Sequence, residues 1–359
     1  MKVQTTKLQN MVAKSIKGTG DNKLIKMTSM MGIDVAKGTL CLTTTDATSY
    51  LYIFDKVSDD TDTFNCAVAA DIFAKLVGKL TNEYTELELT DNTLVVTSNG
   101  KYRIALEPDE NGEPIKIPNP CEGLIPAEGD YLGILSVADI EVMNDVLKPS
   151  LSTNVGSCYA NYIVGQFAVA TDRAMLSGYT KELFKKNLLF TRNFVELLGL
   201  ATDDVMLYHK DDDVVIAEAV GVRVYTKLIA NKDISDYSVD GVNKMLSLEY
   251  ASYCKIKKSE LLNTLERIAI FVGAYDEGAV NVSFTQDGIE VFSKQDRGAE
   301  LVEYMEIKDF KDYSMKIDIN RWIAQLKAYK SDSVDLYFGN PMCIKMTDGD
   351  ISQIIALIA

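Results

Sequence analysis

Residues 67–76 read AVAADIFAKL, and the pattern of this stretch returns twice later in the chain. Residues 193–198 read NFVELL and residues 321–326 read RWIAQL. In each, two adjacent apolar residues are followed three places later by Leu, which places an apolar stripe on one face of a helix. Successive copies begin 122 and 128 residues apart, counted from Asp71. A recurring spacing of this kind indicates internal repeats.

The segments that flank these helices repeat as well. A strand-like run precedes each helix, and two strands joined by a tight turn follow it, with a third strand closing the unit. The entry runs are 64–68, 187–190 and 314–318; the following strands are 86–90, 93–97 and 102–106, then 205–208, 214–217 and 222–226, then 334–338, 342–346 and 354–357. The predicted order is a helix followed by an antiparallel meander.

The same order is predicted earlier in each third of the chain. Helices are expected at about 5–17, 137–148 and 256–271, each followed by apolar strands. Those strands lead to Asp46, Asp172 and Asp296, which are 126 and 124 residues apart. Each third therefore consists of two helix-plus-sheet halves, and the fold class is α+β with helices on one face of antiparallel sheets. The expected domains are 1–120, 121–245 and 246–359.

Composition limits the function. The 359 residues carry 37 Lys and Arg against 52 Asp and Glu, a net charge of −15, and 47% are hydrophobic. This composition is typical of a globular protein, and no stretch has the roughly 20 apolar residues of a membrane span. The six cysteines, which are expected to be reduced and mostly buried, form no CxxC pair. Their positions are 41, 66, 121, 158, 254 and 343. We expect a cytoplasmic protein without disulfides.

Familiar catalytic chemistries find no support in the sequence. His209 is the only histidine, and we expect it to be a solvated loop residue. A serine or cysteine triad, a multi-histidine metal site and a phosphate-binding glycine loop are all missing. Three acidic clusters are better explained as solvated turns than as metal ligands: Asp59, Asp60 and Asp62; Asp109 and Glu110; Asp211, Asp212 and Asp213. We predict no catalytic residue, no metal and no cofactor; an enzyme that uses these clusters with a divalent ion stays an alternative.

Basic residues recur on the exposed faces of the predicted helices, despite the acidic net charge. On the helix from Asp71, Ile72, Phe73, Leu76 and the next apolar residues are expected to be buried, which leaves lysines one turn apart on the other side. The basic residues of these segments are Lys7, Lys14, Lys17, Lys75, Lys79, Lys255, Lys257, Lys258, Arg267, Arg321, Lys327 and Lys330. A single such helix is more often a solvated face, but the repetition favours a basic helical layer.

The order and spacing of these motifs resemble the bacterial sliding clamp, the beta subunit of DNA polymerase III. The resemblance covers essentially the whole chain. It rests on LCLTTTD (40–46) and AVAADIFAKL (67–76), on VATD (169–172) with Leu176, FTRNFVEL (190–197), KLI (227–229) and ISDY (234–237), and on LLNTLERI (261–268) with the final strand.

The resemblance implies a peptide groove between the second and third domains. The matching residues are Tyr159, Thr171, Arg173, Met175, Leu176, Ser235, Val239, Ile355, Leu357 and Ile358. Where the family has Gly-His-Arg after Thr-Asp, this chain has Arg173-Ala-Met175, and its C-terminus also departs from the family pattern. Such divergence suits a phage- or plasmid-encoded clamp with its own partners.

The resemblance also implies a homodimeric ring around double-stranded DNA, bound without sequence preference. Ring closure would involve Tyr102 and Ile104 of one chain and Ile270 and Phe271 of the other, and the DNA-facing set would be Lys7, Lys14, Lys17, Lys75, Lys79, Arg192, Lys255, Lys258, Arg267, Arg321 and Lys327. The implied partners are a DNA polymerase, a clamp loader ATPase and other proteins with clamp-binding peptides. A clamp-fold decoy or assembly protein that does not encircle DNA is the alternative function.

Overall fold

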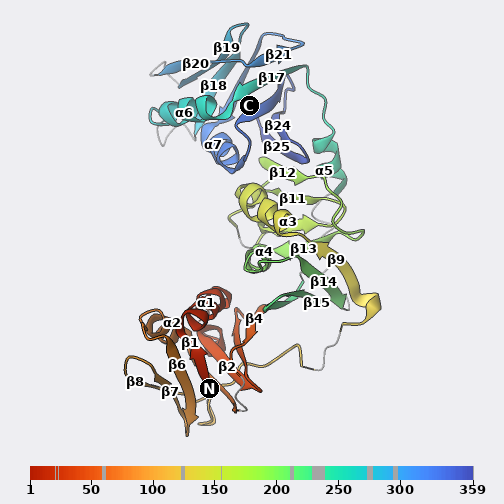
Figure 1. Cartoon of the computed structure of the whole chain (residues 1–359). Coiled ribbons are helices and arrows are strands. Elements are labelled where there is room, and N and C mark those ends of the chain that lie inside the picture. Colours follow the sequence, from red (N-terminus) through yellow and green to blue (C-terminus); the bar gives the residue numbers. More distant parts are fainter. Residues whose placement is uncertain are drawn as a thin grey trace. The chain divides into compact units, whose positions relative to one another are not determined.

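The structure is a computed structural model of the 359-residue chain (Figure 1). It describes residues 1–20, 22, 24–58, 62–122, 126–154, 156–210, 214–228, 239–272, 278–293 and 298–358. The chain divides into two compact units. Unit 1 consists of Met1–Val137 and Asn193–Leu228, and unit 2 consists of Ala138–Arg192 and Ile229–Ala359.

Unit 1 contains an eight-stranded and a four-stranded antiparallel sheet. The strand orders are β5-β2-β3-β4-β16-β15-β14-β9 and β1-β6-β7-β8. The strands are β1 Lys2–Gln4, β2 Met30–Ala36, β3 Thr39–Thr45, β4 Ser49–Lys56, β5 Thr63–Ala69, β6 Tyr84–Thr90, β7 Thr93–Thr97, β8 Lys101–Ala105, β9 Tyr131–Leu135, β14 Val205–Lys210, β15 Val214–Ala219 and β16 Val222–Lys227.

The helices of unit 1 bury one apolar face each. Leu8 and Val12 of α1 and Phe73 and Val77 of α2 are buried, as the helical period predicts. Ile72 was expected to be buried but is 53% exposed, because it lies on the outer side of the short helix. The helices are α1 Thr5–Ser15, η1 Ile16–Gly18, η2 Lys26–Ser29, α2 Ala70–Val77, η3 Glu128–Asp130 and α4 Arg192–Leu198, of which Arg192 belongs to unit 2.

Unit 2 contains a nine-stranded and a four-stranded sheet. The strand orders are β13-β10-β11-β12-β25-β24-β23-β17-β21 and β20-β19-β18-β22. The strands are β10 Asn161–Val164, β11 Ala168–Thr171, β12 Met175–Tyr179, β13 Leu188–Thr191, β17 Ser252–Lys257, β18 Ala279–Phe284, β19 Gly288–Ser293, β20 Ala299–Glu303, β21 Glu306–Lys308, β22 Tyr313–Asp318, β23 Ser333–Phe338, β24 Cys343–Asp348 and β25 Ile351–Ala356.

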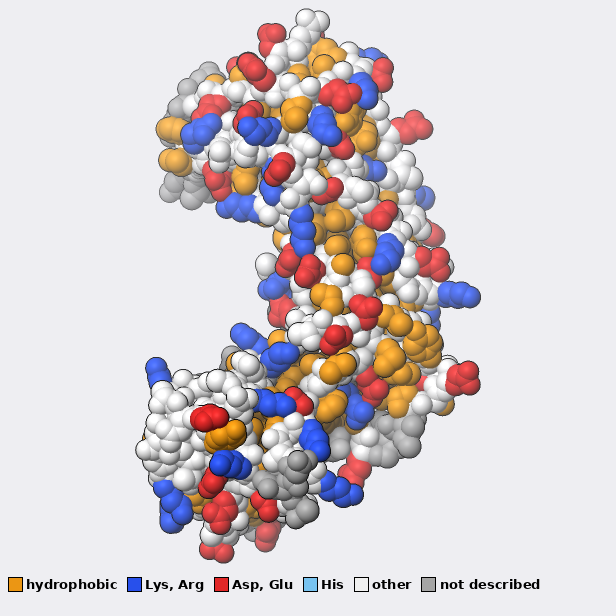
Figure 2. Space-filling view, in the orientation of Figure 1, with side chains coloured by type: hydrophobic (Ala, Val, Ile, Leu, Met, Phe, Trp, Pro, Cys, Tyr) orange, Lys and Arg blue, Asp and Glu red, His pale blue; other side chains and the backbone are white. Residues whose placement is uncertain are grey.

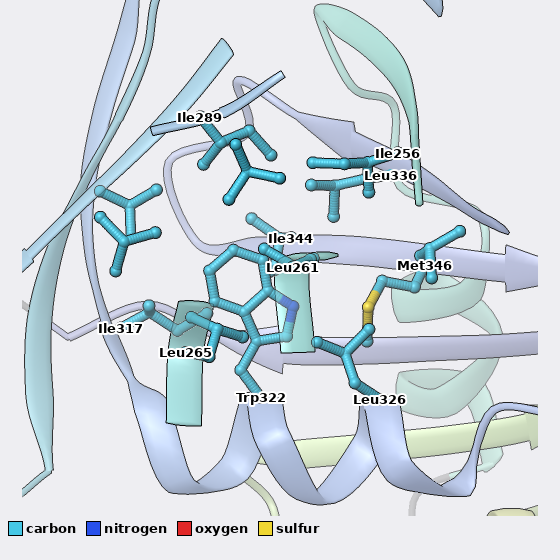
Figure 3. Packing of buried hydrophobic residues seen from close by; sticks show 14 of the residues in the cluster. Ile256, Leu261, Leu265, Ile289, Ile317, Trp322, Leu326, Leu336, Ile344 and Met346 are labelled. Carbon is cyan, nitrogen blue, oxygen red and sulfur yellow. The ribbon is translucent and has the colours of Figure 1, made fainter. Parts of the chain in front are cut away.

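The core of the last third shows how the helices of unit 2 meet its sheets. Trp322 of α7 is fully buried, and its indole points toward the sheets beside Leu261 and Leu265 of α6 (Figure 3). Asp318 caps α7, because its carboxylate accepts the Asn320 backbone N–H at 2.9 Å. The helices are α3 Val137–Glu141, which continues as the π-helix η4 Val142–Leu147, then η5 Lys148–Ser150, η6 Cys158–Ala160, α5 Val239–Leu246, α6 Lys258–Ala269 and α7 Ile319–Ala328.

The strand orders confirm the repeat that the sequence predicts. One four-strand pattern occurs as β5-β2-β3-β4, β13-β10-β11-β12 and β22-β18-β19-β20. The other occurs as β1-β6-β7-β8, β9-β14-β15-β16 and β17-β23-β24-β25. Every adjacent strand pair is antiparallel, and helices accompany the sheets, so the α+β class with paired helix-plus-sheet halves is confirmed.

The larger sheets form where halves from different thirds of the chain join. In unit 1, β16 pairs with β4, so that Tyr225 faces Tyr50. In unit 2, β12 pairs with β25, so that Leu176 faces Ile354. We call these two strand pairs the inter-repeat seams. The corresponding strands β8 and β20 lie at sheet edges and pair on one side only within the described residues.

Candidate functional site: an apolar pocket, basic helices and two sheet edges

A pocket of about 410 Å³ lies in unit 2 beside the β12–β25 seam. Figure 1 shows α5 alongside these strands, and α5 supplies one wall. Most of the pocket surface is apolar, because apolar side chains of α5 face apolar residues of β12 and β25. The lining residues are Tyr159, Thr171, Arg173, Ala174, Met175, Leu176, Gly241, Val242, Lys244, Met245, Ile354 and Ala356. Such a concave apolar surface with few polar groups is typical of a site that binds apolar anchors.

The turn between β11 and β12 forms a second wall and is held by its own side chains. The Asp172 carboxylate accepts the backbone N–H groups of Ala174 at 2.9 Å and Met175 at 2.6 Å. The Thr171 hydroxyl accepts the Arg173 backbone N–H at 3.0 Å. These bonds fix Arg173 in the left-handed region, at φ 78°, which an L-residue rarely adopts. The turn therefore has a defined shape at the pocket.

Two cations lie at the rim of the pocket. Arg173 is exposed and lies over the Tyr159 ring, 5.7 Å from its centroid. Lys244 is exposed on α5 and makes no ion pair with another residue that the structure describes. None of the described lining residues is acidic, so the rim that they form favours a ligand that carries negative charge beside its apolar groups.

α5 is anchored to the sheet behind it. Leu246 is the last residue of α5, and its carbonyl oxygen accepts a hydrogen bond from Lys345 Nζ of β24 at 3.0 Å. A cation at a helix C-terminus stabilises the helix because it satisfies a free carbonyl and opposes the negative end of the dipole. Burial lowers the pKa of Lys345. The contact holds the α5 wall in place.

Five of the residues expected in the groove line the pocket together. They are Tyr159, Thr171, Arg173, Met175 and Leu176. Val239 begins α5 and packs against the apolar cluster beside the pocket, without lining it. Ser235 lies outside the described residues.

The expected C-terminal residues do not line the pocket. Ile355 is fully buried in the core of the last third, and Leu357 packs against the same core. Ile358 lies past β25 and donates its backbone N–H to the Lys316 carbonyl oxygen. Strand alternation explains the position of Ile355: neighbouring residues of β25 point to opposite faces, so Ile354 and Ala356 face the pocket instead. Leu357 and Ile358 lie past the end of β25 at Ala356.

Sequence reasoning missed the wall that α5 provides. Gly241, Val242, Lys244 and Met245 line the pocket but were not expected there. An amphipathic signal was available, because Val239, Val242 and Met245 recur every three residues. The alternation of β25 would likewise have pointed to Ile354.

The expected DNA-facing residues of unit 1 fall into two groups. Lys7 pairs with Asp55 at 2.7 Å and Lys75 with Asp71 at 3.1 Å. Lys14, Lys17 and Lys79 make no ion pair with any described residue. Lys79 follows the end of α2 at Val77 and therefore lies past the helix and not on its face.

The expected DNA-facing residues of unit 2 are mostly engaged by carboxylates. Lys327 pairs with Glu266 at 2.8 Å, and Arg267 binds Glu300 through Nε at 2.8 Å. That hydrogen bond holds the pKa of the Glu300 carboxyl below its ordinary value. Lys255 lies on β17, with its Nζ 3.9 Å from Asp335, and Arg321 on α7 binds Asp172 and Asp318. Lys258 begins α6 and donates to the Tyr329 carbonyl oxygen, and Arg192 begins α4. Figure 2 likewise shows basic and acidic side chains interspersed on the visible face of each unit.

The residues expected at ring closure lie at or near sheet edges. Tyr102 of β8 is 38% exposed and Ile104 of the same strand is buried. Ile270 and Phe271 follow α6 and are 78% and 46% exposed. β20 adds Leu301, which is 51% exposed. Apolar side chains therefore accompany both single-sided edges.

The acidic clusters and His209 are placed in part by the described residues. Asp109 accepts the backbone N–H groups of Asn111 and Glu113, and these bonds lower the pKa of its carboxyl. The described residues contain no group of three or more His, Cys, Asp or Glu arranged to hold a metal; Asp59, Asp60 and the cluster 211–213 lie outside them. His209 differs from the expected loop residue: it lies on β14 opposite Val215 and is half-buried.

All six cysteines are free thiols. Among the described helices, none has the length and apolar character needed to cross a membrane.

Comparisons with known proteins agree with the repeat architecture. No protein-family model and no curated protein matches the sequence. Solved structures match over the full length. The sliding clamp of Bacillus subtilis is 14% identical with a TM-score of 0.82, covering 100% of this chain and 98% of that one. The beta subunit from Streptococcus pyogenes is 16% identical with a TM-score of 0.85, covering 99% of both chains. The Thermotoga maritima beta subunit is 15% identical with a TM-score of 0.83, covering 100% of this chain and 99% of that one. The chain therefore has the fold of the bacterial DNA polymerase III beta subunit, the sliding clamp, from end to end.

Proposed function

We propose that this chain is a DNA sliding clamp, a replication processivity factor that forms a homodimeric ring around duplex DNA. It would tether a DNA polymerase and other partners through peptides bound in the pocket beside the β12–β25 seam. Its three domains would be 1–120, 121–245 and 246–359. The likeness to solved clamps supports the fold, and the observations below support the function.

The single observation that carries the proposal is the pattern of the inter-repeat seams. β4 of the first third pairs with β16 of the second, and β12 of the second pairs with β25 of the third. If this pattern continues, β20 of the last third of the chain would pair with β8 of the first third. A second copy of the chain can supply that partner, so two chains would close into a ring with six seams.

The edge strands β8 and β20, which pair on one side only within the described residues, have the properties that such a seam needs. An unpaired edge strand presents N–H and C=O groups that favour pairing with another strand. Tyr102 on one side, and Ile270, Phe271 and Leu301 on the other, supply exposed apolar side chains for the contact, while Ile104 packs inside its own chain behind β8. Pairing between chains would cover both edges.

Encirclement explains how an acidic protein could hold DNA. At a net charge of −15, non-specific adsorption to phosphates is unfavourable over most of the surface. A ring needs only a few inward-facing cations, since topology and not affinity retains the DNA. Lys14, Lys17 and Lys79 are the first candidates because no described carboxylate neutralises them. Contacts to phosphates alone would let the ring slide without reading sequence.

The pocket supplies the tether. A peptide with apolar anchors would bury them against Val242, Met245 and Ile354, while Arg173 and Lys244 meet its acidic groups. Partners would include the polymerase, a clamp loader ATPase that opens the ring, and other proteins that carry such peptides. In this proposal the chain acts in the cytoplasm and makes or breaks no covalent bond.

Mass in solution and retention on DNA test the proposal together. Size-exclusion chromatography with light scattering at physiological salt should give twice the chain mass of 39.7 kDa. After loading, the protein should stay on nicked circular DNA and leave when the circle is linearised, because only a closed circle is topologically linked. A dimer that never distinguishes the two DNA forms would instead support the decoy or assembly function.

A further inference from the structure

Two hairpin turns of the chain are built in the same way, one in each unit. In unit 1 the Asp46 carboxylate accepts the backbone N–H groups of Thr48 at 2.9 Å and Ser49 at 2.7 Å. In unit 2 Asp172 makes the same two bonds to Ala174 and Met175. Both turns contain a non-glycine residue at φ 78°. The second carboxylate oxygen of each aspartate is bound by a residue of a following helix.

That helix residue differs between the two copies. In unit 1 the Asn193 side-chain amide donates to Asp46 Oδ2 at 2.6 Å. In unit 2 Arg321 of α7 donates from Nη1 to Asp172 Oδ2 at 2.5 Å. Both bonds have an ionised acceptor, but only in unit 2 is the donor charged as well, so that the two groups form an ion pair. Only the unit 2 turn, through Arg173, Ala174 and Met175, lines the pocket.

Arg321 is itself held on two sides. Its Nε lies 3.2 Å from Asp318 Oδ2, and Asp318 is the N-cap of α7. The Arg321 side chain is 32% exposed, and Asp172 is 17% exposed. A continuous set of contacts therefore runs from the first turn of α7 through Arg321 and Asp172 to the backbone of the pocket wall.

We propose that Arg321 is a positioning residue for the pocket and does not serve as a DNA contact. Its ion pair with Asp172 fixes the turn at residues 172–175 in the shape that receives the partner peptide; the peptide part of this statement rests on the proposed function. A DNA phosphate would meet a guanidinium whose charge Asp172 and Asp318 already neutralise, which makes Arg321 a weaker phosphate contact than a cation without such partners. The sequence expectation placed Arg321 in the DNA-facing set, so the two assignments make opposite predictions.

Amide hydrogen exchange tests the positioning without any peptide. In Arg321→Gln the Ala174 and Met175 amides should exchange about tenfold faster, as loss of a charge-assisted bond predicts. The Thr48 and Ser49 amides of the matching turn in unit 1 should be unchanged and serve as the internal control. Arg321→Lys keeps the charge with a single donor group and should restore most of the protection. Unchanged exchange at Ala174 and Met175 in Arg321→Gln would overturn the proposal.

Peptide binding tests the consequence. The probe is the fluorescein-labelled peptide Gly-Glu-Leu-Leu-Phe-Gly, whose apolar and acidic groups match the pocket and its rim. By anisotropy, Arg321→Gln should bind it about tenfold more weakly, a loss of roughly 1.4 kcal/mol. Asp172→Asn should weaken binding similarly, and the double variant should be no worse than either single one, because both remove the same ion pair. Lys327→Gln, on the same helix, is the matched control with unchanged peptide affinity.

The readouts separate this inference from the proposed function. If the wild-type chain does not bind the peptide, the peptide-tether function fails for this class of ligand, and the exchange data alone decide the role of Arg321. If Arg321→Gln leaves exchange and peptide affinity unchanged but weakens DNA binding more than Lys185→Gln does, Arg321 belongs to the DNA-facing set and the inference is wrong; Lys185 is an exposed lysine outside that set.

Discussion

Ser49 and Thr226 are 177 residues apart in the sequence, yet their side-chain hydroxyl oxygens lie 2.8 Å apart in a buried hydrogen bond. The two residues face each other across the β4–β16 seam of unit 1, and each is at most 2% exposed. A polar bond in this position favours this register, since a shift of one strand along the other would take the Ser49 hydroxyl away from its partner on Thr226.

Replacing Thr226 by Val should therefore lower the free energy of unfolding by about 1–3 kcal/mol, because Ser49 would keep a buried hydroxyl without its partner. Urea denaturation followed by circular dichroism measures the change. Thr226→Ser retains the hydroxyl and should lose less. Equal stability of Thr226→Val and the wild type would show that the seam does not depend on this bond.

Stability should fall at alkaline pH because of buried thiols. Burial raises the pKa of Cys66 and Cys254 from 9.0 to about 12. Between these values the unfolded chain has released a proton that the folded chain still holds, so each thiol lowers stability by about 1.4 kcal/mol per pH unit. Below pH 9 neither thiol contributes to the pH dependence.

The Cys254→Ala variant isolates this effect from other groups that titrate in the same range. Urea midpoints at pH 8, 9.5 and 10.5 should decline less steeply for the variant than for the wild type. If the urea midpoints of both proteins declined equally with pH, the Cys254 thiol would have the same pKa in the folded and the unfolded chain.

The ring-closing edge can be tested with a single charge. Ile270→Asp should convert the proposed dimer to a 39.7 kDa monomer, since an aspartate without a partner is costly to bury in an interface. Ile270 and Val220 are both 78% exposed, so Val220→Asp, in the turn between β15 and β16, is a control of equal exposure that is not part of β8 or β20. Light scattering gives both masses. A dimeric Ile270→Asp protein would place the contact elsewhere.

Reversing cations that have no described ion-pair partner should weaken contact with DNA. Lys14→Glu with Lys17→Glu should weaken binding to linear duplex DNA, which a ring does not hold topologically, and should make its salt dependence shallower, since fewer counterions are released. Lys185→Glu in unit 2, an exposed lysine outside the expected DNA-facing set, is the control. A loss about half as large in the control, which reverses one charge where the test variant reverses two, would indicate a net-charge effect and not a DNA-facing surface.

The repeat could be predicted from the sequence because it depends on local periodicity. Three apolar helical patterns and the strands around them recur at similar spacing, and the strand orders of both units follow that pattern. Helix ends were less certain: α3 ends at Glu141 and continues as a π-helix, which no apolar pattern distinguishes from an α-helix.

The pocket was predicted only in part, because its walls come from segments that local patterns do not connect. The 171–176 wall was found through its resemblance to a family motif. The α5 wall depends on how a short helix packs on β25, and the face of β25 depends on its register with β12. Ile355, which the family resemblance implies for the groove, points to the opposite face of β25 from Ile354, because neighbouring strand residues alternate. Likewise, no pattern in the sequence indicates that Arg321 pairs with Asp172, 149 residues away.

The buried indole of Trp322 gives the chain an intrinsic optical label. It is the only tryptophan in 359 residues and lies entirely within unit 2. Tryptophan emission therefore monitors that unit alone, whereas the far-ultraviolet signal sums the backbone of both. Following the two signals through one denaturation series would reveal whether the halves of the molecule melt in a single cooperative step or one after the other.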